Sequence, residues 1–549
     1  MPPKQYIQLI LPLKLEWEPY YKLEDGMNVS LGDRVKAEFA HREYIGVVSR
    51  TDADPASEGV AEDSVKSIVS KEENLPPVSA REIEFWRKIS LYYLCTVGEV
   101  YKAAYPGLRT AVKSPRKKSV PTDAEPSLSE LSAEESEALS KVVSAFRNGK
   151  TVLLEGAGRI PLYISLAKEC LEKGRSVLLL VPEIALSRQL EEKIRKAFPD
   201  LRTFHSQETA ASRRLVEREV RDGTARIVLG TRSSIFLPFR NLGLVIVDDE
   251  HDSSYKQESP APRYNAREAS ILLASVHGAN VVLGSTTPSL ESLYNAEIGI
   301  FAGVKLKNSF RSSGLMLINT SAEIRKNGMS GSFALKLLEK IKSTLDSGGK
   351  TLIVCRAKAA IPEIEEEIKS IFPDAAPGAI TVTAPAGVKL LELENYRLTA
   401  VLQADSLLAK DDFRADERAL QLLQLLQNHE GHLLVIQTRE LKHPVFQALS
   451  GSGNGLIFLP ERRAFNYPPI TRLVSVEIKD SNEKRLWKFS RILADELKSV
   501  PAQRAGDFTF ILQRDKTLNS NKLAIYKIVE SIERKYHYSS HISIDVDPA

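Results

Sequence analysis

Short apolar runs separated by helical segments fill the middle of the 549-residue chain. Residues 132–146 and 162–172 have apolar positions at helical spacing, whereas the runs around them are apolar at nearly every position. These runs are 152–154, 177–181, 227–229, 244–247 and 281–283. Because strands that are apolar on both faces must be covered on both faces, the pattern predicts a parallel sheet between two helical layers. We therefore expect a doubly wound α/β lobe over residues 131–310.

The same alternation begins again further along and predicts a second, smaller α/β lobe over residues 311–460. Its expected helices are 333–345 and 361–371, and its expected strands are 351–354, 400–402 and 433–436. No internal repeat is evident. The fold class is therefore α/β, with two lobes of the same general kind in sequence.

The two ends of the chain follow other patterns. Residues 1–105 contain short strands at 7–13, 32–36 and 45–48 and then a helical segment at 82–94, which is typical of a β-rich domain. Residues 461–549 combine strands at 472–478, 508–512 and 542–546 with a helix at 484–498, which predicts a compact α+β domain. Between the β-rich domain and the first lobe, residues 106–130 are rich in Lys, Arg, Pro and Ser and predict a basic linker.

Composition narrows the class of protein without naming a ligand. Lys and Arg total 75 against 71 Asp and Glu, a net charge of +4, so any nucleic-acid contact must come from local clusters of cations. Cys95, Cys170 and Cys355 lie far apart in sequence, which argues against a zinc ribbon and a disulfide framework. The chain has neither a signal-like start nor an apolar run of membrane-spanning length, so we expect a cytoplasmic protein.

Several segments of the first lobe are similar, in order and spacing, to the helicase motifs of the PriA replication-restart family. They are Val181-Pro182-Glu183-Ile184, His205-Ser206, Gly230-Thr231-Arg232-Ser233, the segment 248–257 and the segment 284–289. Residues 92–95 and 98–100 resemble the end of that family's DNA 3′-end-binding domain, and residues 405–408, 412–418, 467–469 and 545–548 resemble its second lobe and tail. The resemblance implies two RecA-like helicase lobes between an N-terminal β-rich DNA-binding domain and a C-terminal α+β domain.

The nucleotide-binding loop departs from the family pattern. A phosphate loop needs a glycine-rich turn after a strand and a lysine that reaches the phosphates. Here the strand at 152–154 leads into a turn with Gly156, Gly158 and Arg159, which is about three residues shorter than that pattern and has arginine in the lysine position. Ile160 replaces the hydroxyl that would hold Mg²⁺, and Pro161 removes a backbone donor. We expect these residues to be only a remnant of the site.

Of the family's other motifs, the acidic motif is retained in this sequence, whereas the arginine, coupling and zinc-binding segments are not. Asp248, Asp249, Glu250 and His251 keep the family's acidic motif, with Glu250 at the general-base position, but we expect a structural remnant without catalysis. The resemblance places His429 and His432 where the family has two arginines, and only Lys389 survives of the motif that couples the lobes. The family's cysteine-rich zinc segment is absent. We expect no ATP or Mg²⁺ cofactor, unless the remnant still binds nucleotide, and no zinc.

Candidate DNA contacts remain outside those motifs. Arg34, Lys36 and Arg42 lie near Phe39 and Tyr44, a combination that suits a phosphate-tracking groove with a stacking platform. Solvated strand edges around a core Phe39 would give the same pattern. Lys117 and Lys118 of the linker could neutralise phosphates. The residues that match the family's aromatic-rich loop could contact DNA or merely pack the lobe: Tyr255, Lys256, Arg263 and Tyr264.

The sequence therefore favours an initiator of replication restart that binds branched or stalled-fork DNA and promotes primosome assembly and loading of the replicative helicase, without helicase activity of its own. By resemblance, its partners are forked or junction DNA, primosome or helicase-loader proteins and single-stranded DNA-binding protein. Two alternatives stay open. One is an active ATP-dependent superfamily 2 helicase of 3′-to-5′ polarity with an unusual phosphate loop, and the other is a protein-interaction scaffold without fork-specific binding.

Overall fold

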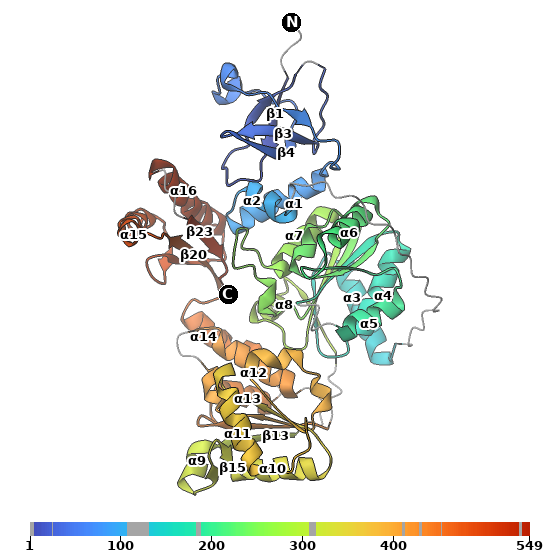
Figure 1. The fold of residues 1–549 in the computed structure, drawn as a ribbon, viewed down its shortest axis with the longest axis vertical. Helices are drawn as coiled ribbons and strands as arrows, with labels where there is room; N and C mark the ends of the chain where they lie inside the picture. The colour runs from blue at the N-terminus through green and yellow to red at the C-terminus, as the bar shows by residue number, and fades with distance from the viewer. Residues whose placement is uncertain are drawn as a thin grey trace.

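The computed structural model describes residues 5–24, 26–106, 131–182, 188–306, 314–408, 412–427, 431–451, 453–536 and 541–548. These residues form four domains, each built around its own sheet (Figure 1). The N-terminal domain lies above the first lobe, the second lobe lies at the opposite end, and the C-terminal domain lies beside the first two (Figure 1). All of the predicted basic linker except its first residue lies outside the described residues.

The N-terminal domain is a five-stranded antiparallel sheet followed by two helices. Its strand order is β2-β1-β4-β3-β5, with β1 at Tyr6–Ile10, β2 at Tyr20–Lys22, β3 at Arg34–Phe39, β4 at Arg42–Arg50 and β5 at Ser70–Lys71. Helices α1 (Ala80–Tyr93) and α2 (Val97–Ala104) follow the sheet. Each begins at a capping box, formed by Ser79 with Glu82 and by Thr96 with Glu99, which fixes where the helices start. The β-rich prediction is confirmed.

The first lobe is a seven-stranded parallel sheet of order β12-β6-β11-β10-β7-β9-β8. Its strands are β6 (Val152–Glu155), β7 (Ser176–Leu180), β8 (Arg202–Phe204), β9 (Ile227–Gly230), β10 (Leu242–Asp248), β11 (Asn280–Ser285) and β12 (Ala302–Lys305). Its helices are α3 (Ala133–Arg147), α4 (Ile160–Glu172), α5 (Arg188–Ala197), α6 (Ala210–Asp222), α7 (Ala266–His277) and α8 (Leu290–Glu297). Successive strand residues pack into two separate cores, one on each face, as the continuous apolar runs predict.

The second lobe repeats this plan with a five-stranded parallel sheet of order β13-β19-β18-β16-β17. Its strands are β13 (Gly314–Asn319), β16 (Thr351–Val354), β17 (Ile380–Thr383), β18 (Leu398–Val401) and β19 (Leu433–Thr438). Its helices are α9 (Thr320–Arg325), α10 (Leu335–Asp346), α11 (Ile361–Ile371), α12 (Ala415–Gln427), α13 (Pro444–Ser450) and α14 (Leu459–Ala464). The predicted helix at 333–345 begins two residues late, because a small hairpin of β14 (Met329–Ser330) and β15 (Phe333–Ala334) takes its first two positions.

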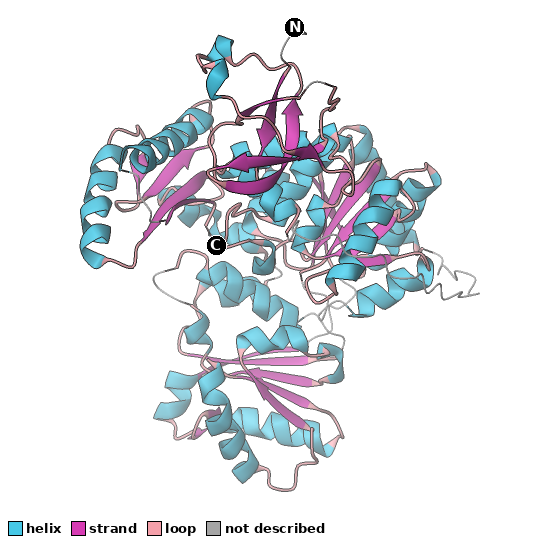
Figure 2. Ribbon diagram, turned by 45° about the horizontal axis from the view of Figure 1, so that its top comes forward, coloured by secondary structure: helices cyan, strands magenta, loops and turns pink. Residues whose placement is uncertain are grey.

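The C-terminal domain packs two helices on a four-stranded antiparallel sheet of order β21-β22-β20-β23 (Figure 2). The strands are β20 (Thr471–Lys479), β21 (Gln503–Arg504), β22 (Thr509–Gln513) and β23 (His541–Val546), and the helices are α15 (Glu483–Leu497) and α16 (Leu518–Tyr536). This confirms the α+β prediction. Within the described parts of the chain, no helix is both long and apolar enough to cross a membrane.

The domains are joined by shared apolar cores. One cluster contains Trp86 of α1, Leu273 of α7 and Phe510 of β22, so it continues through the N-terminal helices, one face of the first lobe and the C-terminal domain. Leu290, the first residue of α8 in the first lobe, belongs instead to a core cluster of the second lobe. The arrangement of the domains therefore rests on buried apolar contacts, which are the main favourable contribution to folding and association.

Candidate functional site

In the turn after β6, both backbone polar groups of Gly156 are hydrogen-bonded to other residues of the protein. The N–H of Gly156 donates to the carbonyl oxygen of Ser285 at 2.9 Å, and the carbonyl oxygen of Gly156 accepts from Nη1 of Arg159 at 2.6 Å. Gly156 and Gly158 have φ values of 124° and 74°, a conformation that glycine adopts without strain. The backbone of this turn is therefore engaged with the protein at Gly156 and does not present that N–H to a ligand.

Arg159 is buried and reaches across to the end of β10. Its Nη2 lies 2.7 Å from Oδ1 of Asp248 and 3.0 Å from Oδ1 of Asp249. The hydroxyl of Tyr163 donates to the same oxygen of Asp248 at 2.8 Å. Burial alone would lower the pKa of Arg159, but Asp248 and Asp249 hold it well above its ordinary value, so the guanidinium stays charged. An arginine from the loop thus pairs with both aspartates and offsets part of their negative charge.

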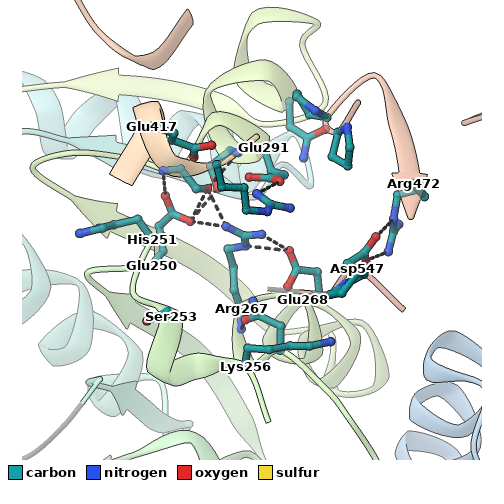
Figure 3. A pocket seen from close by; sticks show the side chains of 18 of the residues that line it. Glu250, His251, Ser253, Lys256, Arg267, Glu268, Glu291, Glu417, Arg472 and Asp547 are labelled. Atoms are coloured by element: carbon teal, nitrogen blue, oxygen red, sulfur yellow. Dashed lines mark hydrogen bonds and ion pairs between the residues drawn. The ribbon is translucent and has the colours of Figure 1, made fainter. Parts of the chain in front are cut away.

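Glu250 points away from that site, into the base of α8. Its carboxylate accepts from the backbone N–H of Ser289 at 2.7 Å, from the hydroxyls of Ser289 and Ser292 at 2.9 Å each, and from Nη1 of Arg267 at 3.0 Å. Figure 3 shows this cluster, with Arg267 between Glu250 and Glu268. Glu250 is 1% exposed. It acts as a buried anchor for the start of α8, where a negative charge is favourable.

His251 is also used in internal bonds. Its Nδ1 lies 2.8 Å from the hydroxyl of Ser285, and its Nε2 lies 3.3 Å from the hydroxyl of Thr287. The acidic motif predicted from the sequence is therefore brought together with the segment 284–289, as expected for residues that follow neighbouring parallel strands. The sequence did not indicate the partners Arg267 and Tyr163, which come from helices well separated from the motif.

The two lobes meet through charged and apolar contacts. The backbone N–H of Leu290 donates to Oε1 of Glu417 at 2.8 Å, and Arg414 pairs with Glu291 at 2.6 Å. Lys389, the surviving residue of the coupling motif, pairs with Asp252 of the first lobe. A cavity of about 290 Å³ lies between the lobes and the C-terminal domain, lined in part by Arg267, Glu291 and Glu417 (Figure 3). The lobes are thus bonded to each other through the protein's own residues.

The structure describes only one of the two histidines that stand where the family has arginines. His432 is buried at the start of β19, where its Nε2 lies 2.8 Å from the hydroxyl of Thr399. It is therefore part of the packing between strands of the second lobe. His429 lies outside the described residues.

The residues of the aromatic-rich loop are buried. Lys256 pairs with Asp545 at 2.6 Å and donates to the carbonyl oxygen of Val546 at 2.8 Å, while Arg263 pairs with Glu477 at 2.7 Å. Tyr255 and Tyr264 are 0% and 2% exposed. Because a DNA contact needs an accessible side chain, all four loop residues serve in this conformation to pack the lobe and to hold β20 and β23 of the C-terminal domain.

The candidates in the N-terminal domain divide in a similar way. Arg34 is buried, and its guanidinium lies 4.1 Å from the centroid of the Tyr105 ring, so it cannot reach a phosphate in this conformation. Lys36 is partly exposed and lies 3.5 Å from Glu72, whereas Arg42 is exposed. Phe39 and Tyr44 are partly buried against the core of this domain. Lys117 and Lys118 lie outside the described residues.

Two family models match this chain. The model described as the PriA 3′DNA-binding domain matches residues 8–106, and the DEAD/DEAH box helicase model matches residues 148–296. The first matches the N-terminal domain, and the second covers most of the first lobe.

Curated relatives extend the similarity along the whole chain. The replication restart protein PriA of Rickettsia felis and that of Rickettsia conorii are each 24% identical to this chain, over 98% of its length and 99% of theirs. The PriA of Bacillus subtilis is 28% identical over 63% of this chain and 54% of its own. Among solved structures, RecG bound to a three-way DNA junction covers 74% of this chain and 50% of its own, at 13% identity and a TM-score of 0.39. On the two domain models and the full-length relatives, the chain is similar along its whole length to the replication restart protein PriA.

Proposed function

We propose that this chain is a cytoplasmic initiator of replication restart that binds branched or stalled-fork DNA and does not hydrolyse ATP. The proposal that the chain does not hydrolyse ATP rests on one observation, which is that Arg159 pairs with Asp248 and Asp249. In P-loop enzymes an aspartate at this place holds the magnesium that neutralises the phosphates. Here a fixed guanidinium already supplies that positive charge.

The residues around the turn do not fit a magnesium nucleotide. The turn lacks the lysine and the hydroxyl that such a site needs, and its backbone is bonded inward at Gly156. Glu250, at the general-base position, accepts four hydrogen bonds and is buried, so it is not placed to take a proton from water. The proposed function therefore does not require ATP.

The DNA-binding half of the proposal rests on the match of residues 8–106 to the PriA 3′DNA-binding domain. The full-length relatives are replication restart proteins, and we extend that role to this chain: it promotes primosome assembly and loading of the replicative helicase. Its proposed partners are fork DNA, primosome or helicase-loader proteins and single-stranded DNA-binding protein. The proposal requires no zinc, because Cys95, Cys170 and Cys355 lie in three different domains.

One specific observation favours an active ATP-dependent helicase as the second candidate. Residues 148–296 match the DEAD/DEAH helicase model, and the acidic motif at 248–251 is intact in sequence. For ATP to bind with magnesium in this candidate, Arg159 must leave the aspartates and the turn must open. That rearrangement breaks a buried ion pair, which typically costs several kcal/mol.

The test measures fork binding and ATP turnover on one preparation of the full chain. We expect tighter binding to a fork with a 3′ end at the branch than to a duplex of equal length, and turnover no higher with fork DNA than without it. Turnover that fork DNA stimulates and that Asp248→Asn abolishes would establish the helicase instead. Equal affinity for fork and duplex, without turnover, would favour a protein-interaction scaffold.

A further inference from the structure

Helix α15 carries an exposed aromatic side chain among cations. Trp487 is 64% exposed, the highest value of the chain's three tryptophans. Lys484, Trp487, Lys488 and Arg491 stand at positions i, i+3, i+4 and i+7 of the helix, so they share one side of it, which we call the α15 face. All four side chains are exposed. The opposite side of the helix buries three apolar residues in the domain: Phe489, Leu493 and Leu497.

The positive charge of the α15 face is only partly offset by the carboxylates near it. Asp480 accepts from Nη2 of Arg485 at 2.7 Å, and Asp495 pairs with Lys498 at 2.7 Å. The charge of Arg491 also lowers the pKa of Asp495, after the larger effect of Lys498, and the exposed Glu483 lies beside Lys484. Among the described residues, no ion pair involves the three cations of the face. Arg491 lies instead 4.9 Å from the centroid of the Trp487 ring, which holds the indole among charges.

The α15 face is also open in the whole molecule. Helix α15 lies at the outer edge of the C-terminal domain, away from the second lobe and from the N-terminal sheet, and both views agree on this (Figures 1 and 2). From Lys484 to Arg491 the face extends for about 10 Å along the helix axis. No described segment of the chain covers it, since its side chains are exposed within the complete four-domain arrangement.

The geometry points to single-stranded DNA as the ligand of the α15 face. A single strand offers unpaired bases that can stack on an exposed indole and phosphates that can pair with the surrounding cations. Duplex DNA keeps its base faces stacked inside the helix, so it offers the charge without the aromatic surface. An acidic peptide likewise satisfies the cations and leaves Trp487 uncovered. The face thus binds the single-stranded arm of the fork, an inference that rests on the proposed DNA-binding function.

The experiment uses the full chain with Trp17→Phe as the background. Trp17 is the other exposed tryptophan, at 57%, and Trp86 is 1% exposed, so ligand-dependent fluorescence then reports mainly on Trp487. Titration with an oligothymidine is expected to quench this fluorescence. Titration with a duplex or with oligoglutamate is expected to leave it nearly unchanged.

Two variants measure the contribution of the face to affinity. Trp487→Ala is expected to weaken oligothymidine binding by roughly 5- to 150-fold, the range that loss of one stacked base gives. Lys484→Ala with Lys488→Ala is expected to weaken binding and to reduce the slope of log affinity against log salt by about 1.4. The matched control is Lys340→Ala with Lys342→Ala, which removes two exposed lysines from α10 of the second lobe and should change neither quantity beyond a small uniform effect.

The outcomes separate this inference from the proposed function. If the protein prefers forks but Trp487 is not quenched, or if both α15 variants keep the parental affinity for oligothymidine, the α15 face is not a DNA site and the proposed function stands. If oligoglutamate quenches the fluorescence of Trp487 and oligothymidine does not compete with it, the face is a docking site for acidic protein segments. If the protein binds neither forks nor oligothymidine, both the inference and the proposed function fail.

Discussion

At the scale of single residues, Arg159 pairs with both aspartates of the acidic motif. Its guanidinium lies between two aspartates that would otherwise repel each other. We therefore predict that Arg159→Met lowers the free energy of unfolding by about 3–5 kcal/mol, because it leaves two partly buried carboxylates without their cation. Urea unfolding followed by circular dichroism measures this loss.

The control for that prediction removes the aspartates' charge as well. Arg159→Met combined with Asp248→Asn and Asp249→Asn should recover most of the lost stability, since no uncompensated charge remains. An unfolding midpoint of Arg159→Met equal to that of the parent protein would show that the ion pair has no structural role.

Glu250 leads to a second prediction at this scale. In a working ATPase, removing the base stops turnover and need not change stability. Here the carboxylate of Glu250 anchors α8 by accepting hydrogen bonds from Ser289, Ser292 and Arg267. Glu250→Gln replaces one accepting oxygen with an NH₂ group, which donates and therefore cannot accept from these groups. We expect it to lower the free energy of unfolding by about 2–4 kcal/mol. Glu297→Gln, an exposed change at the other end of α8, should leave the unfolding curve unchanged. A fully stable Glu250→Gln protein would contradict the anchoring role.

At the scale of elements, α8 couples the two lobes. Its first residue, Leu290, is buried in a core of the second lobe, although the helix belongs to the first. Leu290→Ala should cost about 2–5 kcal/mol, as is usual for truncating a buried leucine. Because the lost contact joins the lobes, we also expect calorimetry to resolve two unfolding transitions where the parent protein has one.

The matched control for α8 is Leu273→Ala. Leu273 lies in α7 and packs within the cluster of the first lobe and its neighbours, so this variant is similarly destabilised but does not remove a contact with the second lobe. Its two lobes should still unfold in one transition. If Leu290→Ala also unfolds in one transition, the coupling between the lobes depends on the ion pairs and not on this core contact.

Elements are also the scale at which the sequence was most informative. Continuous apolar runs such as 244–247 correctly predicted the central strands, because burial on both faces leaves no polar positions. Edge strands such as β8 were not predicted, since Arg202, Thr203 and Phe204 are only partly buried and carry no such pattern. Helix α5 was also missed, because its sequence is mostly charged.

Side-chain environments could not be predicted in the same way. Tyr255 and Lys256 read equally well as exposed DNA contacts or as buried packing. In the structure Lys256 is buried where it pairs with Asp545 of β23, whereas Tyr255 is buried in the first lobe, where its hydroxyl donates to the carbonyl oxygen of Asp248. The pairing of Arg159 with Asp248 joins residues 89 positions apart and depends on the order of β6, β11 and β10 in the sheet. Trp487 was hidden within a correctly predicted helix, where its spacing from Lys484, Lys488 and Arg491 was the available signal.

At the scale of the whole molecule, ion pairs and a hydrogen bond join the two lobes directly. Arg414 with Glu291, Lys389 with Asp252 and Leu290 with Glu417 all join the first lobe to the second. Of these carboxylates, Asp252 and Glu291 have lowered pKa values, whereas burial and the charge of Glu291 raise the pKa of Glu417. Burial alone would raise the pKa of Glu291, but Arg414 and Arg267 lower it to about 2. Since this pKa lies below the ordinary value of 4.5, folding favours the ionised form.

This shift predicts how the interface responds to acid. A carboxylate whose pKa is depressed by folding stabilises the protein fully above the unfolded pKa and loses that contribution as the pH falls toward the folded one. The stability difference between the parent protein and Glu291→Gln should therefore be constant above pH 4.5 and should shrink between about pH 4.5 and 2. Denaturant titrations of both proteins across this range measure it, with Glu297→Gln as the control that shows no such change. A difference that stays constant down to pH 2 would mean that the Glu291–Arg414 pair does not hold the lobes together.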